Sequence, residues 1–373
     1  MSEWITPGKT IGIIGGGKIA RQMAVAARKL GYHIAILDPR QDCPAAELAE
    51  WMIQAEYLDE KAVMELAFKC DAVLYESEEA YADVLERVQR TVVVPQGEQL
   101  LSVAQDRTLQ KAYLESLSIN IAPFATIVTK EDIKEAISGI GFPCVLKPNQ
   151  ADDKTIRPLV LQDESDIDKS DALLRRGTCV LEAWIPFERE LCAVGAKDIN
   201  GKVIQLALSE TVYKRSRLYQ SFTPARIQPE VAEEVERIVT TFAEQTFFQG
   251  VFSVELFVTS TGTLYVNGIL PSPHPSADYT ESTLNLSQYE AHIRAVCGWP
   301  LPDTKANTQT VMMPFYSEHF SKINKQIQLK PEWKFAFHGH NQPDEPAGYV
   351  TIPTENLPST LDVLSDINLW DER

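Results

Sequence analysis

The sequence predicts a fold of mixed class, α/β at the N-terminus and α+β further along the chain. Strands and helices alternate over residues 1–104, which is typical of a doubly wound parallel sheet with helices on both faces. Over residues 105–299, strands surround helices without strict alternation, which indicates a separate α+β domain. Short strands dominate residues 300–373 and predict a small C-terminal β-rich domain. A chain of 373 residues is long enough for two or three such domains.

The N-terminal domain begins with a short apolar strand, Thr10–Ile14, that runs into consecutive glycines. The helix after it places Ile19, Met23 and Leu30 on one face, and Gly31 ends it. The alternation is expected to continue with a strand at 33–37, a helix at 60–68, a strand at 72–75, a helix at 79–89 and a strand at 92–94.

The central and C-terminal domains are expected to combine amphipathic helices with antiparallel strands. Thr129 is placed to act as the N-cap of one of these helices. In the central domain we expect helices at 106–117, 130–137 and 229–247, strands at 144–147 and around 159, and antiparallel strands from 179 to 212. In the C-terminal domain we expect strands at 310–313, 334–337 and 349–352 and a last helix near Leu361.

Composition makes some classes of partner improbable. The formal net charge of −17 argues against nucleic acid or an anionic membrane as the main partner, although a small phosphorylated ligand needs only a local cluster of donors. The six cysteines are scattered without CxxC or zinc-like spacing, so reduced core thiols of a cytoplasmic protein are expected. The sequence contains no apolar signal core and no apolar run of membrane-spanning length, so we expect no membrane association.

A glycine turn follows the first strand, with the pattern Gly15-x-Gly17-x-x-Ala20, and Asp38 ends the next strand. Glycines let the backbone approach a phosphate, and the N-terminus of a helix favours an anion. Three interpretations stay open: a tight strand-to-helix turn, a site for a substrate phosphate or carboxylate, and a dinucleotide site for NAD. The antiparallel character of the central domain is unlike a dehydrogenase substrate domain and disfavours NAD.

The segment from Val251 to Pro275 predicts two strands joined by a turn at Ser260-Thr261-Gly262. Such a turn would place Glu255 and Asn267 roughly opposite each other. A carboxylate and an amide that face one pocket can hold a hard cation and the phosphates that it bridges. The residue after Asn267 is Gly268, so the pair contains a single carboxylate.

Several motifs occur in a characteristic order across nearly the whole chain: IGIIGGGKIARQMAVAARKLGY, LYESE, QDRTLQK, VLEAWIPFERE, VFSVELFV and LYVNGILPSPH. Together they resemble those of an ATP-grasp ligase family of purine synthesis, 5-(carboxyamino)imidazole ribonucleotide synthase (PurK, the ATPase subunit of phosphoribosylaminoimidazole carboxylase). The resemblance implies an N-terminal doubly wound pre-ATP-grasp domain, a central ATP-grasp domain and a small C-terminal β-rich domain. It also implies a homodimer that uses ATP and bicarbonate, through carboxyphosphate, to carboxylate aminoimidazole ribonucleotide.

The resemblance also implies which side chains bind ATP and its magnesium ion. Arg107 and Lys147 match cations that bind phosphate, and Asn267 belongs to the same ATP site. Glu182 matches the position that reads the adenine amine, and Glu190 matches the carboxylate that accepts hydrogen bonds from the ribose hydroxyls. One metal-binding glutamate of the family matches Glu255.

On the substrate side, the resemblance points to the glycine turn and to the segment after the hairpin. No residue is assigned a certain catalytic role. The residues implied to bind substrate are Gly15, Gly17, Lys18, Tyr75, Glu76, His274 and Ser276.

The chain departs from the family pattern at several of these places. The second metal glutamate of the family falls at Gly268, and an arginine of the family falls at Ser272. Residues 151–157 replace a glycine-rich loop, residues 340–347 lack the lysine and arginine that clamp phosphate in the family, and Tyr213 replaces a histidine. An alternative therefore stays open: a catalytically impaired or repurposed ATP-grasp paralogue that binds a nucleotide or metabolite without carboxylating it.

Overall fold

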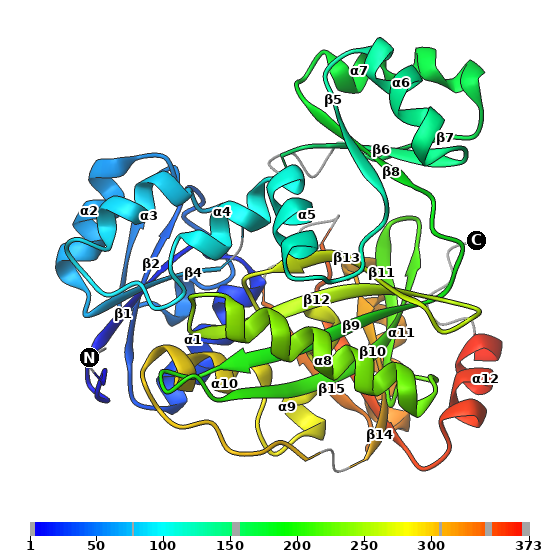
Figure 1. Ribbon diagram of the computed structural model, residues 1–373. Helices are drawn as coiled ribbons and strands as arrows, with labels where there is room; N and C mark the ends of the chain where they lie inside the picture. The colour runs from blue at the N-terminus through cyan, green and yellow to red at the C-terminus, as the bar shows by residue number, and fades with distance from the viewer. Residues whose placement is uncertain (1–3, 77, 151–156, 306–307, 340–344, 368–373) are drawn as a thin grey trace.

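A computed structural model describes residues 4–76, 78–150, 157–305, 308–339 and 345–367. The N-terminal domain lies at the left of Figure 1, and a small lobe rises at the upper right above a large sheet. The predicted fold class is confirmed, because a parallel sheet precedes a large sheet whose strand pairs are antiparallel. None of the described helices has the length and apolar character needed to cross a membrane.

The N-terminal domain is built on a parallel sheet with the strand order β3-β2-β1-β4. One prediction for this domain was wrong, and one strand was missed. Trp51–Gln54 forms an edge strand that the pattern did not reveal, whereas residues 92–94 contribute only an isolated bridge between Val93 and Ala72. The elements are β1 (Thr10–Ile14), α1 (Lys18–Lys29), β2 (His33–Asp38), β3 (Trp51–Gln54), α2 (Glu60–Lys69), β4 (Ala72–Tyr75) and α3 (Ala82–Val88).

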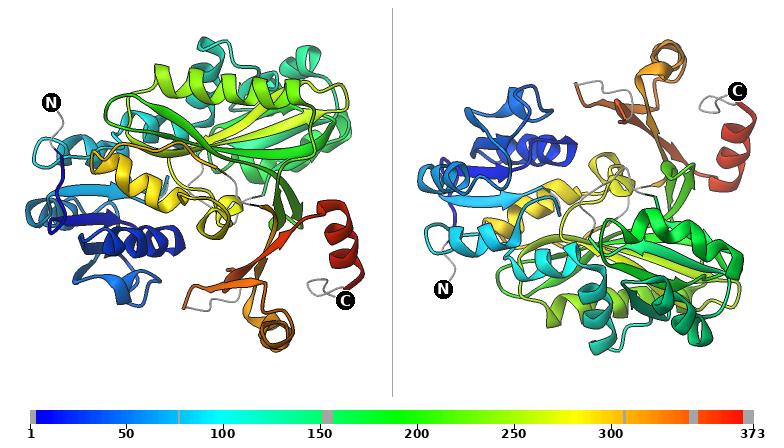
Figure 2. Two further views of the ribbon diagram at one scale, coloured as in Figure 1. Left: turned by 90° about the horizontal axis from the view of Figure 1, so that it is seen from below. Right: turned by 90° about the horizontal axis from the view of Figure 1, so that it is seen from above.

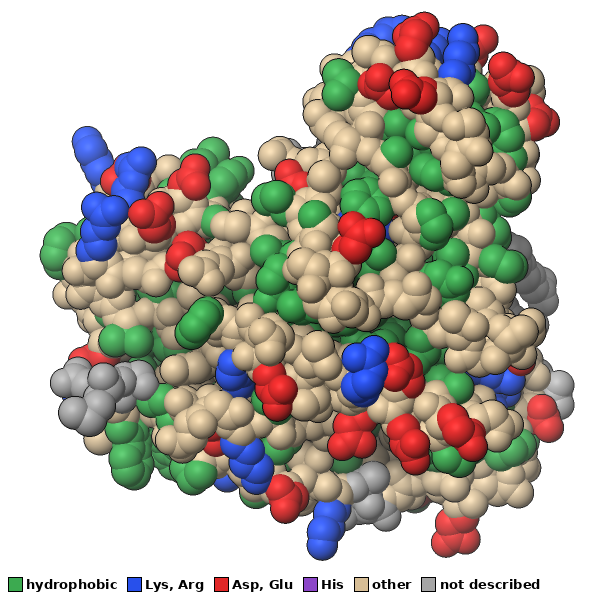
Figure 3. Space-filling model, viewed as in Figure 1, with side chains coloured by type: hydrophobic (Ala, Val, Ile, Leu, Met, Phe, Trp, Pro, Cys, Tyr) green, Lys and Arg blue, Asp and Glu red, His purple; other side chains and the backbone are tan. Residues whose placement is uncertain are grey.

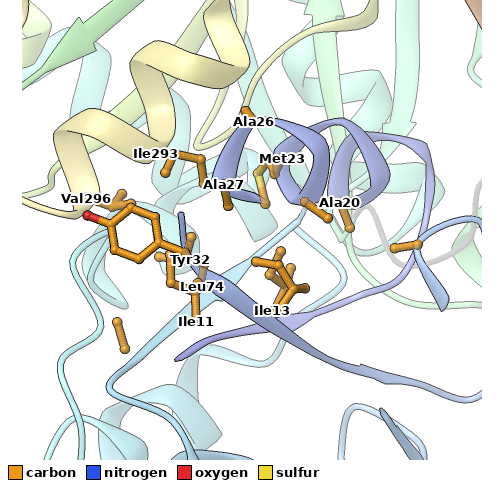
Figure 4. Close-up of a cluster of buried hydrophobic side chains, with 14 of the residues drawn as sticks. Ile11, Ile13, Ala20, Met23, Ala26, Ala27, Tyr32, Leu74, Ile293 and Val296 are labelled. Carbon is orange, nitrogen blue, oxygen red and sulfur yellow. The ribbon is translucent and has the colours of Figure 1, made fainter. Parts of the chain in front are cut away.

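Apolar side chains on the two faces of this sheet form separate clusters. On one face Ile11 and Ile13 pack with Met23 of α1 and with Ile293 and Val296 of α10 (Gln288–Val296), as Figure 4 shows. The other face packs against α2 and α3. Because α10 belongs to the central domain, the first cluster fixes the N-terminal domain against the rest of the molecule.

The small lobe contains an antiparallel sheet with the order β5-β8-β6-β7, covered by helices. Thr129 caps its long helix, as predicted, because its side chain accepts a hydrogen bond from Asp132 N while the Asp132 carboxylate accepts one from Thr129 N. The elements are β5 (Phe124–Ile127), α6 (Lys130–Ile140), β6 (Cys144–Pro148), β7 (Leu159–Leu161), α7 (Asp171–Leu174) and β8 (Cys179–Ala183).

The large sheet has eight strands in the order β13-β12-β9-β10-β11-β14-β16-β15. The C-terminal strands continue this sheet through the pairing of β11 with β14, and they project with α11 (Phe320–Leu329) and α12 (Leu357–Ile367) to one side of the molecule in Figure 2. The strands are β9 (Phe187–Lys197), β10 (Val203–Lys214), β11 (Arg217–Thr223), β12 (Gly250–Thr259), β13 (Leu264–Leu270), β14 (Gln309–Phe315), β15 (Lys334–Phe337) and β16 (Gly348–Thr354).

The remaining helices pack around this sheet. An apolar face of α8 covers β9 and β12, as the amphipathic pattern predicted. All six cysteines carry free thiols, and only Cys70 is not fully buried, in agreement with the expected core thiols. These helices are α4 (Gln99–Gln105), α5 (Arg107–Ser116), α8 (Pro229–Gln245), α9 (Thr280–Thr283), α11 (Phe320–Leu329) and α12 (Leu357–Ile367).

Candidate active site

A buried cluster of charged side chains lies where the small lobe meets helix α5. Glu182 on β8 is 5% exposed, and its Oε2 lies 3.0 Å from Lys147 Nζ on β6 and 3.2 Å from Lys111 Nζ on α5. Burial opposes the ionisation of Glu182, but the charges of Lys147 and Lys111 outweigh it and lower the pKa of the carboxyl. The Glu182 carboxylate is therefore a charged anchor for two lysines.

Lys147 extends this cluster from the small lobe to the large sheet. Its Nζ also donates to Asn267 Oδ1 on β13, at 3.2 Å, and Asn267 Nδ2 donates to Glu255 Oε2 on β12, at 3.4 Å. A continuous polar chain, Glu182–Lys147–Asn267–Glu255, thus joins the two sheets. Figure 3 shows the molecule hollowed between the small lobe and the N-terminal domain.

The hairpin that carries Glu255 and Asn267 differs slightly from the prediction. The residue directly opposite Glu255 is Gly268, and the next pair is Leu256 with Val266. Asn267 is therefore the extra residue of a β-bulge, which re-aims a side chain toward a site. The two predicted residues are brought together, but as diagonal neighbours.

Histidine 274 lies on the other side of Glu255. His274 Nε2 is 3.4 Å from Glu255 Oε1, and His274 Nδ1 accepts a hydrogen bond from Ser276 N at 3.2 Å. An amide that donates to Nδ1 favours the tautomer with its proton on Nε2, which then points at the carboxylate. Burial opposes the ionisation of Glu255. The hydrogen bond from His274 and the charges of Lys147 and Arg107 nevertheless lower the pKa of the Glu255 carboxyl.

Glu190 on β9 is a carboxyl group whose ionisation depends on the charge of Glu255. It is paired across the strands with Phe257, two residues beyond Glu255. Burial and the charge of Glu255 raise the pKa of Glu190 to about 7. This carboxyl therefore changes charge near neutral pH.

The small number of acidic side chains beside Glu255 limits which metal ion the site can hold. In the part of the chain that the structure describes, no group of three or more His, Cys, Asp or Glu side chains has the geometry of a metal site. Mg²⁺ commonly uses one or two carboxylates together with substrate phosphates and water. Glu255 is the one carboxylate on these two strands, since Gly268 offers no second one, and Asn267 would add its Oδ1 to a magnesium site only by turning it from Lys147 toward the ion.

Arg107 lies at the start of α5, next to the end of β6. Its Nε donates to Pro148 O at 3.0 Å, and its backbone amide donates to Asn149 O. Arg107 and Lys147 are thus held on neighbouring elements of one site. The loop that replaces the glycine-rich segment of the family lies outside the described residues at 151–156, and Arg157 follows it.

The glycine turn binds carboxylates of the protein itself. Gly16 N donates to Asp38 Oδ2 at 2.8 Å, Gly17 N donates to Glu76 Oε2 at 2.6 Å, and Ile19 N donates to Glu76 Oε1 at 3.1 Å. A Cβ at position 17 would lie 2.3 Å from Glu76 Oε1, which explains the glycine. The amides that would cradle an external phosphate are already satisfied, so the structure favours the interpretation as a tight turn.

Two further residues implied to bind substrate have partners within the protein. Lys18 Nζ lies 2.9 Å from Glu345 Oε2, although burial lowers the pKa of this lysine. Tyr75 is fully buried, and its hydroxyl donates to Gly97 O, so in this structure its side chain belongs to the core rather than to a surface. Gly15 has a φ of +97° and closes the turn beside Glu76.

Sequence reasoning missed one member of the site, Lys111, and did not predict the burial of Asp278. Lys111 lies within the motif QDRTLQK, and its spacing of four from Arg107 places both on one helix face. Asp278 is 6% exposed, and its Oδ1 accepts hydrogen bonds from Tyr289 Oη and Gln288 Nε2. No local pattern could reveal Asp278, because its partners come from α10.

Comparison with known proteins connects this geometry to a family. The ribonucleotide synthetase preATP-grasp domain model matches residues 8–105, and the ATP-grasp domain model matches residues 112–289. The N5-carboxyaminoimidazole ribonucleotide synthase of Bacillus subtilis (strain 168) is 33% identical over 338 residues, which cover 91% of this chain and 89% of that protein. The synthase of Staphylococcus aureus (strain MRSA252) is 32% identical over 95% of each chain.

Solved structures agree with these sequence matches. The ADP complex of an N5-carboxyaminoimidazole ribonucleotide synthetase superimposes with a TM-score of 0.95 at 33% identity, covering 100% of this chain and 99% of the other. The Staphylococcus aureus synthetase complexed with ADP gives a TM-score of 0.91 at 30% identity, with 98% of each chain covered.

Proposed function

This chain belongs to the N5-carboxyaminoimidazole ribonucleotide synthase family of ATP-grasp proteins, and we propose that it carboxylates 5-aminoimidazole ribonucleotide with bicarbonate at the expense of ATP. ATP-grasp proteins bind ATP, and the family models together span most of the chain. Similarity over the full length of synthases, rather than over one domain, does not favour the alternative of an impaired or repurposed paralogue.

The observation that carries the proposal is the polar chain Glu182–Lys147–Asn267–Glu255 between the two sheets. A nucleotide bound between the lobes would contact each member. We assign phosphate binding to Lys147 and Arg107, whose charges are held on adjacent elements. Phosphoryl transfer depends mainly on positioning and on neutralising charge, which are what cations fixed in a half-buried site provide.

Glu182 and Glu190 would recognise the adenosine part of the nucleotide. Glu182 is held in place by two lysines, so we expect its carboxylate to accept from the adenine amine and to fix Lys147 toward the phosphates. Glu190, when ionised, would accept hydrogen bonds from the ribose hydroxyls. Its raised pKa makes this contact sensitive to pH.

One magnesium ion would be held by Glu255 and phosphate oxygens, and by Asn267 Oδ1 if that amide turned from Lys147 toward the ion. When bound, it would neutralise charge on the phosphates. His274 Nε2–H would keep Glu255 oriented, and Ser276 fixes the ring of His274 in turn. Orientation of a metal-ligating carboxylate by a neighbouring hydrogen bond is a general feature of such sites.

We assign the ribonucleotide substrate to the side of the cleft formed by the glycine turn and the segment after β13. Glu76 there is held by two backbone amides, and Lys18, the residue after Gly17, supplies a cation that pairs with Glu345 in this structure. A homodimer in the cytoplasm stays a prediction from the family resemblance.

The proposal is tested by the release of ADP that depends on both 5-aminoimidazole ribonucleotide and bicarbonate. With ¹³C-bicarbonate, the carboxylated amine should appear as a new carbamate carbon signal. Glu255→Gln should lower the rate by at least about a hundredfold, since it removes the only carboxylate ligand proposed for the metal. Glu236→Gln, at an exposed position of α8, is the matched control.

If ADP release does not depend on the ribonucleotide, the proposed function is wrong. If it does depend on the ribonucleotide but Glu255→Gln retains the full rate, the assignment of the metal ligand is wrong and the function stands.

A further inference from the structure

Asp278 is a buried carboxyl group between the N-terminal domain and the segment after β13. It follows the short turn Pro275–Ala277 and is 6% exposed. Burial lowers the pKa of Lys18, and the charges of Glu345 and Asp278 oppose this effect, so Asp278 acts on the helix that begins at the glycine turn. The titratable groups that interact with Asp278 are Lys18 of α1, His274 before the turn, Glu281 of α9, Tyr289 of α10 and Tyr349 of β16. The carboxyl group therefore lies on the side of the cleft that we assign to the ribonucleotide.

One oxygen of Asp278 is fixed by two donors from α10. Tyr289 Oη donates to Oδ1 at 2.5 Å, and Gln288 Nε2 donates to the same atom at 3.1 Å. Among the described residues, no hydrogen-bond donor reaches Oδ2, and that atom is not enclosed by protein. The carboxyl group is thus oriented through one oxygen and offers the other to a ligand.

Gln288 also fixes the turn that carries Asp278. Its Oε1 accepts a hydrogen bond from His274 N at 3.0 Å, and its Nε2 donates to His274 O at 2.9 Å as well as to Asp278. Gln288 is fully buried, so this amide holds both ends of the turn in one geometry. A reacting group that is held by its neighbours in this way is positioned before a substrate arrives.

Two other carboxylates near the glycine turn already use both of their oxygens. Glu76 accepts a backbone amide on each oxygen, and the Asp38 oxygens accept from Arg40 and Tyr57. Burial opposes the ionisation of Asp38, but its hydrogen bonds with Arg40 lower the pKa of this carboxyl. Hydrogen bonds to the ionised form make a carboxylate a weaker base. Asp278 differs from both, because its Oδ2 can still accept a proton.

The proton affinity of Asp278 suits proton transfer at neutral pH. Burial raises its pKa to about 7, and the charge of Glu281 adds to this, whereas Tyr289 and His274 oppose the rise. A general base is most effective when its pKa lies near the working pH. Ionisable groups whose pKa is shifted in this way are concentrated at active sites.

We propose that Asp278 is the general base of the carboxylation, with Oδ2 accepting the proton that the amine of the ribonucleotide loses. This role rests on the proposed function. The amine nitrogen forms a bond to the carboxyl carbon of carboxyphosphate, the bond from that carbon to the phosphate oxygen breaks, and phosphate leaves with the electron pair. The N–H electron pair stays on nitrogen and the proton passes to Asp278, so no oxidant or reductant is required.

The first test measures carbamate formation from ¹³C-bicarbonate between pH 5.5 and pH 8.5. In the parent, kcat/KM for the ribonucleotide should rise with pH through about 7, because the base must be ionised. Asp278→Asn keeps an acceptor for Tyr289 and Gln288 but removes the base, so the rate at pH 8 should fall by about a hundredfold and the limb near pH 7 should disappear. Asp83→Asn, at an exposed position of α3, should retain both the rate and the limb.

Tyr289→Phe tests the same assignment without removing the carboxyl group. The hydrogen bond from Tyr289 lowers the pKa of Asp278, so its loss should move the limb to higher pH. A purely structural role of Asp278 would leave the limb in place in both variants, even if the rate fell.

A second measurement tests the contact with substrate and needs no turnover. The ribonucleotide is titrated at pH 7 by isothermal calorimetry in two buffers of different ionisation enthalpy. An amine that donates to Oδ2 favours the ionised carboxylate, so binding to the parent should release protons. Asp278→Asn should release only those protons that come from the phosphate of the ligand.

The outcomes separate this proposal from the proposed function. If the parent forms the carbamate and Asp278→Asn retains its rate and its limb, Asp278 is not the base and the function stands. Equal proton release by the parent and Asp278→Asn would overturn the contact between Oδ2 and the amine. If the parent forms no carbamate, the proposed function is wrong and the role of Asp278 as its base falls with it.

Discussion

Glu255 and Gly268 are direct partners across strands β12 and β13, and a Cβ at position 268 would lie 3.5 Å from Glu255 Oε2. The next nearest atom would be Gln110 Oε1 at 3.6 Å. Both distances are ordinary van der Waals contacts. A Cβ at position 268 therefore fits without a clash and lies on the side of Glu255, so a longer side chain there that ended in a carboxylate would give the metal site a second anionic ligand.

Gly268→Glu is expected to raise the rate of ADP release in the carboxylation assay by about tenfold or more, because a second carboxylate would hold the magnesium ion between the phosphates. The gain should appear in kcat at saturating ATP. Gly268→Gln is the matched control, since it adds nearly the same volume without the charge. If both variants gain equally, side-chain volume rather than charge explains the effect.

Glu182→Gln is expected to lower the free energy of unfolding by about 3 kcal/mol, because it leaves Lys111 and Lys147 without their shared counter-charge. Urea unfolding followed by circular dichroism measures this change. Glu188→Gln is the control: its carboxylate is 52% exposed and pairs with Arg189, so a change within about 0.5 kcal/mol is expected. An equal loss in both variants would show that the buried cluster is not the cause.

The raised pKa of Glu190 leads us to expect that nucleotide binding depends on pH. Its pKa of about 7 means that the carboxylate, the form that accepts hydrogen bonds from a ribose, is a minority at pH 6 and the majority at pH 8. The affinity for ADP should therefore rise by about tenfold between pH 6 and pH 8. Calorimetric titration at several pH values measures it.

Glu190→Gln supplies the control for that experiment, because it retains only the titration of the nucleotide itself. The difference between the two pH profiles then isolates Glu190. Parallel profiles would show that the ionisation of Glu190 is not linked to nucleotide binding.

Much of the fold could be predicted from local pattern. Strand β1, helix α1 and the Thr129 cap follow from period and capping chemistry, which act within a few residues. Edge strand β3 was missed because Trp51–Gln54 is short and none of its residues is fully buried. Its place depends on pairing with β2, which no local pattern records.

In the candidate site, too, local pattern predicts some residues, whereas others depend on contacts between distant parts of the chain. Glu255 and Asn267 were found because a hairpin turn fixes their separation, yet the bulge that makes Gly268 the direct partner is a property of the paired strands. The sequence predicted the glycine turn, but it did not predict which group accepts hydrogen bonds from the amides of that turn. Glu76 comes from after β4 and takes the amides that an external anion would need.

The raised pKa of the buried Asp278 carboxyl leads us to expect that the free energy of unfolding depends on pH. Burial raises its pKa to about 7, and the charge of Glu281 adds to this, whereas the hydrogen bonds from Tyr289 and Gln288 oppose the shift. The folded state therefore binds a proton that the unfolded state has released between about pH 4 and pH 7. Because stability falls wherever the folded state binds more protons, the cost grows as the pH rises through this interval and is fully present above about pH 7.

Asp278→Asn removes that charge and keeps an oxygen that accepts from Tyr289 Oη and Gln288 Nε2. We expect it to stabilise the protein at pH 8 by on the order of 3 kcal/mol relative to its effect at pH 5, where the parent carboxyl is largely protonated. Urea unfolding at both pH values measures this difference. Asp83→Asn, at an exposed position of α3, should change stability by less than about 0.5 kcal/mol at either pH. A stabilisation by Asp278→Asn that is the same at pH 5 and pH 8 would show that side-chain packing, and not the ionisation of Asp278, limits the stability of this region.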